Sequence, residues 1–306
     1  MTPSHQTTNY DFVSKRKLWY AISMALIIPC LVFFFMGGLK LGIDFTGGSL
    51  FELAFKKTPT VAVMRDVLQS VDKEKFSDAQ VSILKDDTQQ EIISIRSKSI
   101  DNKEQVEIFD AIRDKAGDFE QVRVEVVGPT IGAELRSKAI WATLFVMGMI
   151  VLYISFRFSF DYAMCGIAAL FHDVVIVLGS FSMLGYFYGI EVDSLFVTAV
   201  LTVAGFSIHD TIVTFDRIRE NAGDMGRGKS FSQVANDSIN QTLARSINTS
   251  ITTMFPLLTL SFFGGATIKY FSLAMLIGII AGAYSSIFVA SPLLVSWRTL
   301  TRASHS

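Results

Sequence analysis

Residues 18–39 read LWYAISMALIIPCLVFFFMGGL, a run of 22 residues without a charged side chain. Three basic residues precede the run at positions 15–17, and Lys40 follows it. About 20 apolar residues in a helix suffice to cross the hydrocarbon core of a bilayer. The run is too long for the apolar part of a typical signal peptide, and no small-residue cleavage pattern is clear before Lys40. We therefore expect a membrane-spanning helix that is retained in the protein.

The rest of the chain contains five more stretches with the length of a membrane span. Two of them are interrupted by a His-Asp pair. The five stretches are residues 139–156, 162–190, 194–215, 244–268 and 270–297. Together with residues 18–39 they predict an α-helical polytopic membrane protein with six transmembrane helices, five of them in a bundle over residues 139–297.

Charged residues are concentrated between the first two spans. The 99 residues from Lys40 to Lys138 hold 15 basic and 18 acidic residues, 33 of the 55 in the chain. If both termini are cytoplasmic, 11 Lys and Arg residues lie on the cytoplasmic side, against Lys269 alone outside. By the positive-inside rule this asymmetry fixes the orientation in a cell inner membrane. Residues 40–138 are then periplasmic, and the cytoplasmic parts are residues 1–17, 216–243 and 298–306.

The composition excludes several classes of protein. Hydrophobic residues make up 50% of the chain and charged residues 18%, against about a quarter charged in soluble domains. A formal charge of −1 gives no positive field for a nucleic acid, so no nucleic-acid partner is expected. Both cysteines, Cys30 and Cys165, lie in apolar runs that do not favour a disulfide or a metal site.

The charged segment alternates between strand-like and helix-like patterns. Strand-like stretches, with alternating or β-rich sequence, are residues 49–55, 79–84, 91–97 and 121–127. Apolar residues spaced by three and four predict helices over residues 60–71 and 106–116. The order β-α-β-β-α-β predicts an inserted α+β domain of the ferredoxin-like type. We identify no His, no Cys and no convergent pair of carboxylates in it, which favours a binding or lever domain without catalysis.

A polar stripe runs along the span 194–215. Ser207, Asp210, Thr211 and Thr214 are spaced i, i+3, i+4 and i+7 and so share one helical face. An Asp inside a membrane helix costs about 2.5–3.5 kcal/mol on insertion scales, which makes Asp210 a candidate functional residue. His209 points away from the centre of this stripe, so packing explains it at least as well as a proton-relay role.

The span 244–268 repeats the pattern, with Arg245 near its cytoplasmic end. The polar residues that share one stripe here are Thr242, Arg245, Ser246, Thr249 and Thr253. A guanidinium keeps its charge and needs an anion or carbonyl groups nearby. Because the two antiparallel spans place Asp210 and Arg245 at similar depth, we expect the two side chains to pair. Such a pair acts either as a proton switch coupled to helix movement or as a static lock on helix packing.

His172 and Asp173 form a second pair of ionisable residues, in the span 162–190. They lie at a depth that allows them to belong to the same polar interior. The sequence leaves open whether they face the stripe of Asp210.

Several short motifs follow one another along the chain. They are GIDFTGG at 42–48, VGP at 127–129, GAEL at 132–135, HD at 172–173, FSIHDTIVTFDRIREN at 206–221, TLARSINTS at 242–250 and FGG at 263–265. In this order they resemble the motifs of the SecF subunits of the SecD/SecF family, which is related in fold to the RND superfamily. The resemblance covers nearly the whole chain.

The resemblance implies that the helices form half of a pseudo-symmetric twelve-helix unit with SecD. It implies use of the proton-motive force to help pull an unfolded preprotein out of the SecYEG channel, with YajC as a further candidate partner. Carried onto this chain, the proton-coupling acid is Asp210 and its basic partner is Arg245. The motif after the first span contributes Gly42, Asp44, Gly47 and Gly48. The family commonly has Asn where this chain has His209, so its local polar network does not carry over unchanged.

Other functions stay open at this point. An RND-like small-molecule exporter would share the helices and the buried acid, although the outer domain is small for a substrate porter. A structural translocon subunit would use Asp210 and Arg245 only to lock helices. An enzyme is not expected, because no placed nucleophile and base, no metal-protease motif and no phosphate-binding loop are found. No cofactor is expected, and the coupling ion is H+ with Na+ as the alternative.

Overall fold

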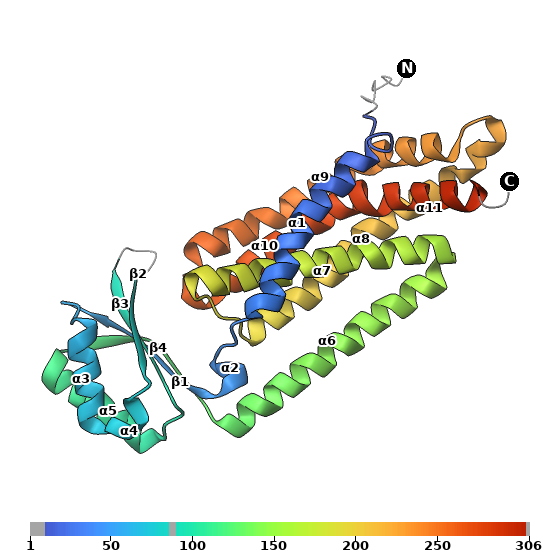
Figure 1. The fold of residues 1–306 in the computed structure, drawn as a ribbon. Helices are drawn as coiled ribbons and strands as arrows, with labels where there is room; N and C mark the ends of the chain where they lie inside the picture. The colour runs from blue at the N-terminus through green and yellow to red at the C-terminus, as the bar shows by residue number, and fades with distance from the viewer. Residues whose placement is uncertain (1–9, 86–89, 304–306) are drawn as a thin grey trace.

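The computed structural model describes residues 10–85 and 90–303. A bundle of long helices carries a small domain with one four-stranded sheet at one of its ends (Figure 1). The first and last described residues lie at the other end of the bundle (Figure 1).

The bundle is built from seven helical elements of the described chain. They are α1 (Arg16–Gly37), α6 (Pro129–Arg157), α7 (Phe160–Tyr188), α8 (Ser194–Asn221), α9 (Phe231–Phe263), α10 (Gly265–Ser285) and α11 (Ser291–Ala303). Five described segments are long and apolar enough to cross a membrane: α1, α6, α7, α8 and residues 268–301. The 33-residue α9 is not among them, since its apolar half is rich in Ser and Thr. The protein is thus a largely helical multipass membrane protein.

The stretch 216–243, expected as a cytoplasmic loop, is mostly helical. α8 continues to Asn221, a 3-10 turn (η1, Ala222–Arg227) follows, and α9 begins at Phe231. A capping box starts α9, in which the Ser230 hydroxyl accepts from the Gln233 N–H and the Gln233 side chain accepts from the Ser230 N–H. Because Phe231 and its neighbours one turn on are buried in the bundle, this segment gains apolar burial by being helical.

The last expected span, residues 270–297, is not one regular helix. Helix starts earlier, at Gly265, and a π-helical turn (η2, Ser286–Ala290) separates α10 from α11. Single π turns inside α-helices often occur at functional sites, because they rotate the side chains that follow relative to those before.

The small domain has its four strands and two longer helices in the order expected from the hydrophobic pattern, with one short helix, α4, that was not expected. Its elements are β1 (Gly48–Phe55), α3 (Val61–Val71), α4 (Lys73–Phe76), β2 (Gln80–Lys85), β3 (Glu91–Ser97), α5 (Asn102–Ala116) and β4 (Phe119–Val127). The strands lie in the order β2-β3-β1-β4, and all three pairings are antiparallel. Phe51, Leu53 and Ile93 of the sheet pack against Leu68 and Ile112 of the helices. One face of the sheet is therefore covered by α3 and α5 (Figure 1).

Two apolar clusters fill the interior of the bundle. The cluster nearer the sheet domain, called the sheet-side cluster, includes Val177, Phe181, Val200, Val203, Leu257, Ala274 and Ile279. The cluster nearer the ends of the chain, called the terminus-side cluster, includes Phe12, Val13, Ala169, Phe215, Ile239, Ile287 and Leu294. Each of α7, α8, α9 and the last helical segment contributes to both clusters.

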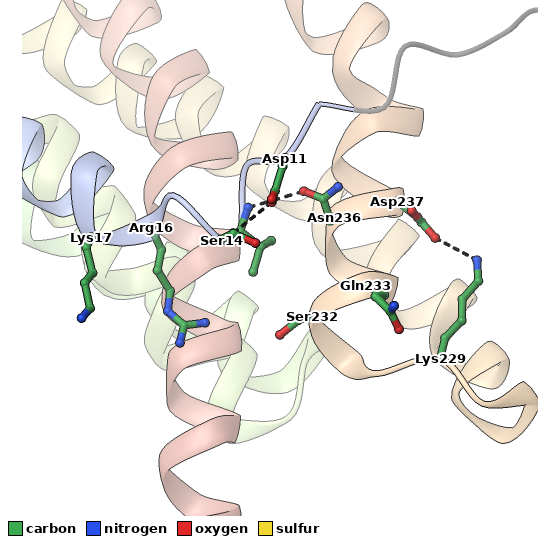
Figure 2. A pocket seen from close by; sticks show the side chains of 10 residues that line it. Asp11, Ser14, Arg16, Lys17, Lys229, Ser232, Gln233, Asn236 and Asp237 are labelled. Carbon is green, nitrogen blue, oxygen red and sulfur yellow. Dashed lines mark hydrogen bonds and ion pairs between the residues drawn. The ribbon is translucent and has the colours of Figure 1, made fainter.

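The N-terminal residues 10–14, called the strap, close the terminus-side cluster. Asn236 of α9 accepts hydrogen bonds from the N–H groups of Phe12 and Val13, at 2.9 and 3.4 Å, and donates to the Tyr10 carbonyl. Phe12 and Val13 are thereby buried in the bundle. Figure 2 shows Asn236 directed at the strap, beside a cavity of about 640 Å³.

Candidate functional site

Asp173 of α7 is completely buried and lies among polar side chains of three helices. Its Oδ2 accepts a hydrogen bond from Ser207 Oγ of α8 at 2.5 Å and one from Ser285 Oγ of α10 at 2.6 Å. Its Oδ1 lies 2.8 Å from His172 Nδ1. A buried carboxylate is tolerated only when hydrogen bonds replace its lost hydration, and here three partners do so.

Asp210 of α8 is 8% exposed and is held in the same manner. Its Oδ1 accepts from Ser246 Oγ of α9 at 2.7 Å, and its Oδ2 accepts from Ser286 Oγ at 2.5 Å. Ser286 is the first residue of the π turn. Four serine hydroxyls therefore hold the two carboxylates. We call these two acids and four serines the polar layer.

The polar layer lies between the two apolar clusters. Along α8, Val200 and Val203 of the sheet-side cluster precede Ser207 and Asp210, and Phe215 of the terminus-side cluster follows. The same order holds in the other three elements of the layer, α7, α9 and the segment from α10 to α11. The polar layer is thus closed off by apolar side chains toward both ends of the bundle. Hydrophobic constrictions of this kind gate water and ions in membrane proteins.

Close contact between α8 and α10 depends on two glycines. A Cβ atom on Gly278 would lie 2.2 Å from a methyl carbon of Val203, and one on Gly282 would lie 3.1 Å from the Cα of Ser207. Small residues let membrane helices approach closely enough for side chains to hydrogen-bond across the interface. The glycines therefore bring Ser285 and Ser286 within reach of the two carboxylates.

The expected pair of Asp210 and Arg245 is not formed. Within the described part of the chain Arg245 makes no ion pair, and its side chain is exposed. The buried polar residues of α9 at this depth are spaced by four on one face and are Thr242, Ser246 and Ser250. Arg245 stands next to this face rather than on it. The sequence pattern placed Arg245 and Ser246 on one broad stripe, and the packing of α9 selects Ser246.

The other predicted residues divide into those in the layer and those outside it. Thr214 is buried and donates to the backbone carbonyl of Asp210 at 3.3 Å. Thr211 is buried with no hydrogen-bond partner for its hydroxyl among the described residues. Thr249 and His209 are exposed, although packing or a proton-relay role was expected for His209 and a place on the polar stripe for Thr249. Ser207 lies in the layer, but its hydroxyl binds Asp173 and not Asp210.

His172 is buried in the layer beside Asp173. Its ring stacks on that of Tyr284 with the centroids 6.0 Å apart. The Nε2 atom is buried and has no hydrogen-bond partner among the described residues. The sequence left open whether His172 and Asp173 face the stripe of Asp210. Asp173 does so through its bond from Ser207, and His172 is buried beside Asp173.

Two residues of the layer, Ser285 and Ser286, were missed in the sequence. The only signal for them is a pair of adjacent serines within the apolar run of residues 270–297. Adjacent residues point in directions about 100° apart on a regular helix, so a single stripe cannot include both. Their separate contacts depend on the neighbouring helices, which periodicity along one helix does not reveal.

Gly42, Asp44, Gly47 and Gly48 lie outside the polar layer, where the bundle meets the sheet domain. Asp44 belongs to the short helix α2 (Ile43–Thr46), and Gly48 begins β1. Among the described residues no group of three or more His, Cys, Asp or Glu side chains is arranged to hold a metal ion.

Family models match this chain over most of its length. The model for the C-terminal region of the protein export membrane proteins SecD and SecF matches residues 107–300. The model for the SecD/SecF GG motif matches residues 32–59. The chain belongs to the SecD/SecF family.

Curated SecD/SecF relatives match over almost their full length. The protein translocase subunit SecF of Thermobaculum terrenum is 45% identical over 298 residues, which cover 94% of this chain and 93% of that one. The SecF of Anaerolinea thermophila is 39% identical over 296 residues, 94% of each chain. The crystal structure of SecDF, a translocon-associated membrane protein from Thermus thermophilus, matches with a TM-score of 0.82 and 33% identity. That match covers 97% of this chain and 40% of the SecDF chain, so this chain spans about two fifths of that protein's length.

Proposed function

We propose that the chain is the SecF-type subunit of a SecD–SecF complex that uses the proton-motive force to assist preprotein translocation through the SecYEG channel. The observation that carries this proposal is the polar layer, in which two buried carboxylates connect four helical elements between two apolar clusters. The resemblance of the whole chain to SecF subunits supports it.

The polar layer is suited to exchange protons and to respond to the exchange. Asp210 joins α8 to α9 and to the π turn through two hydroxyl donors. When a carboxylate takes up a proton it loses its charge, and its strong charge-assisted hydrogen bonds weaken. The helices held by those bonds are then free to repack. One proton crossing 100 mV releases about 2.3 kcal/mol, which is enough to bias two arrangements of helices.

Arg245 keeps its role as the basic partner in this proposal, with a different contact from the one first expected. Its guanidinium is exposed on α9, and a permanent cation near the membrane interior needs an anion. SecD, or another arrangement of α8 and α9, supplies that anion.

The membrane arrangement in this proposal has six spans, with α9 as the fifth and both termini in the cytoplasm of the cell inner membrane. The sheet domain is then periplasmic. Its strand order, with two helices on one face, supports a ferredoxin-like fold. An unfolded preprotein and YajC are further partners. The proposal includes no enzymatic reaction and no cofactor. H+ is the coupling ion and Na+ the alternative, and assays with and without Na+ separate them.

Export into inverted membrane vesicles tests the function. The vesicles contain SecD, the channel and one of three versions of this chain: the parent, Asp210→Asn or Glu220→Gln. The ATP concentration is the same in all three. Glu220 is the matched control, an exposed acid on the same helix. We expect the stimulation of export by the proton-motive force to be lost only in Asp210→Asn. Equal stimulation in all three would rule out the proposed role.

A further inference from the structure

Residues 40–48 connect α1 to the sheet domain, and they also contact the start of two other membrane helices. We call this segment the joint. Its contacts lie at the end of the bundle opposite the strap, where the loop of residues 189–193 leads from α7 into α8.

Asp44 of the joint caps the N-terminus of α8. Its Oδ2 accepts a hydrogen bond from the Ser194 N–H at 2.9 Å and one from Ser194 Oγ at 2.6 Å. α8 also has a cap of its own, because Asp193 Oδ1 accepts from the Phe196 N–H at 2.9 Å. A carboxylate at a helix N-terminus is stabilised by unpaired N–H groups and by the helix dipole. α8 therefore starts between two carboxylates, one local and one from the joint.

The backbone of the joint is bound to the same loop. The Gly42 N–H donates to the Val192 carbonyl at 2.8 Å, and the Val192 N–H donates to the Lys40 carbonyl at 2.8 Å. A Cβ atom on Gly42 would lie 3.1 Å from the Val192 carbonyl oxygen, so the close approach favours glycine. These bonds hold the loop and the joint together as one unit.

The other side of the joint is pressed against the start of α6. Gly47 and Gly48 have φ values of +71° and +137°, which favour glycine. A Cβ atom on Gly47 would lie 2.8 Å from the Cα of Pro129, and one on Gly132 would lie 2.7 Å from the nitrogen of Gly47. The paired glycines thus let the chain turn into β1 while it touches α6.

The sheet itself contacts the same loop. Glu191 forms ion pairs with Arg96 of β3 and with Lys40 of the joint. The start of α8 is therefore connected to β3 through the loop and Glu191, and to β1 through the joint.

We propose that the joint transmits movement of α8 to the sheet domain, with Asp44 as the positioning residue that couples them. This inference rests on the proposed function of Asp210. Ser194 and Asp210 belong to one continuous helix without proline, separated by about 24 Å at 1.5 Å per residue. A shift of α8 at the polar layer therefore reaches Ser194, and the two bonds to Asp44 carry it into the joint.

Distances between two spin labels test this proposal in the full chain assembled with SecD in liposomes. The labels are placed on exposed positions by Asp114→Cys on α5 and Phe187→Cys on α7, since the native Cys30 and Cys165 are buried. Asp210→Asn mimics the protonated acid. We expect it to shift the distance distribution when Asp44 is present and to cause no shift in Asp44→Ala.

Two further variants distinguish coupling from helix capping. Asp193→Ala removes the local cap of α8 and should leave the shift intact. Asp44→Asn keeps an oxygen for Ser194 and should also retain it. The proposal is overturned if Asp44→Ala still shows the shift, if Asp193→Ala abolishes it equally, or if Asp210→Asn causes none in the otherwise unchanged chain. Failure of the proposed function is recognised separately, because export would then be stimulated equally in the parent and in Asp210→Asn.

Discussion

Ser285 and Ser286 are neighbours in the chain, yet each donates its hydroxyl to a different buried carboxylate. Ser285 binds Asp173 on α7, and Ser286 binds Asp210 on α8. The π turn begins at Ser286 and changes the direction of the side chains at this point. Because the two serines share one stretch of backbone, a change in the hydrogen bond of Asp210 to Ser286 affects the position of Ser285, the donor to Asp173, and the reverse also holds.

Removing either hydroxyl should weaken both the fold and its coupling. In Ser285→Ala or Ser286→Ala a buried carboxylate loses a charge-assisted hydrogen bond, which costs about 1.5–3 kcal/mol. Thermal unfolding in detergent measures the loss, and export driven by the proton-motive force measures the coupling. Ser291→Ala is the control, since its buried hydroxyl binds only the Ser286 carbonyl. Export lost equally in Ser291→Ala would show that general packing, and not the acids, explains the effect.

Adding one methyl group between α8 and α10 should separate them. In Gly278→Ala the new Cβ meets the side chain of Val203, and overpacking of this kind costs about 1–3 kcal/mol. Val203→Ala in the same chain should restore part of the stability and of the export activity. Gly148→Ala on α6, where nothing lies within 4 Å of the new atom, should not destabilise the chain. A Gly278→Ala chain as stable as the parent would contradict the close packing of these helices.

Releasing the strap should open the terminus-side cluster. Asn236→Ala removes the acceptor of the Phe12 and Val13 N–H groups, so these two amides should exchange hydrogen for deuterium faster. Tyr10 keeps its hydrogen bonds to the side chain of Asn240 of α9. Mass spectrometry of the N-terminal peptide measures the rate. Ser232→Ala lies beside the same cavity and is the control (Figure 2). Unchanged exchange in Asn236→Ala would mean that apolar burial and the bonds between Asn240 and Tyr10 hold the strap without Asn236.

Acidic pH should destabilise helix α5 of the sheet domain, which is stable at neutral pH. The backbone N–H of Glu104 lowers the pKa of Asp101, and the hydrogen bond from Lys75 lowers the pKa of Glu104. Acids with a lowered folded pKa stabilise the fold above their unfolded pKa, about 4, and lose that contribution as the pH falls through the folded value. Protection of α5 amides, compared with those of α3 at each pH, should therefore fall below about pH 4. Asp101→Asn should flatten this dependence, and an unaltered pH profile in that variant would contradict it.

The sequence predicted the elements better than their partners. Uncharged runs and positive flanks located the apolar helices, and the spacing of Ser207, Asp210, Thr211 and Thr214 placed them on an inward face, which the burial of all four confirms. Which neighbour each side chain meets depends on the rotation of the facing helix. Arg245 and Ser246 differ by one position, and only the packing of α9 determines that Ser246 contacts Asp210.

The boundaries of helices were predicted least well where burial and capping act together. The capping box at Ser230 and the buried Phe231 begin α9 well before its apolar part. The π turn at Ser286 has no sequence signature of its own, and it lies where Ser285 and Ser286 bind carboxylates of two different helices.

The role of Asp210 in proton-driven export is tested by measuring proton entry and export in the same liposomes. Liposomes that contain the complex with SecD and the channel, and a pH-sensitive dye inside, receive an imposed proton gradient in the presence of a preprotein. We expect export and preprotein-dependent proton entry both to rise with the gradient in the parent, and both responses to disappear in Asp210→Asn. Proton entry and export in Asp210→Asn equal to those of the parent would contradict it.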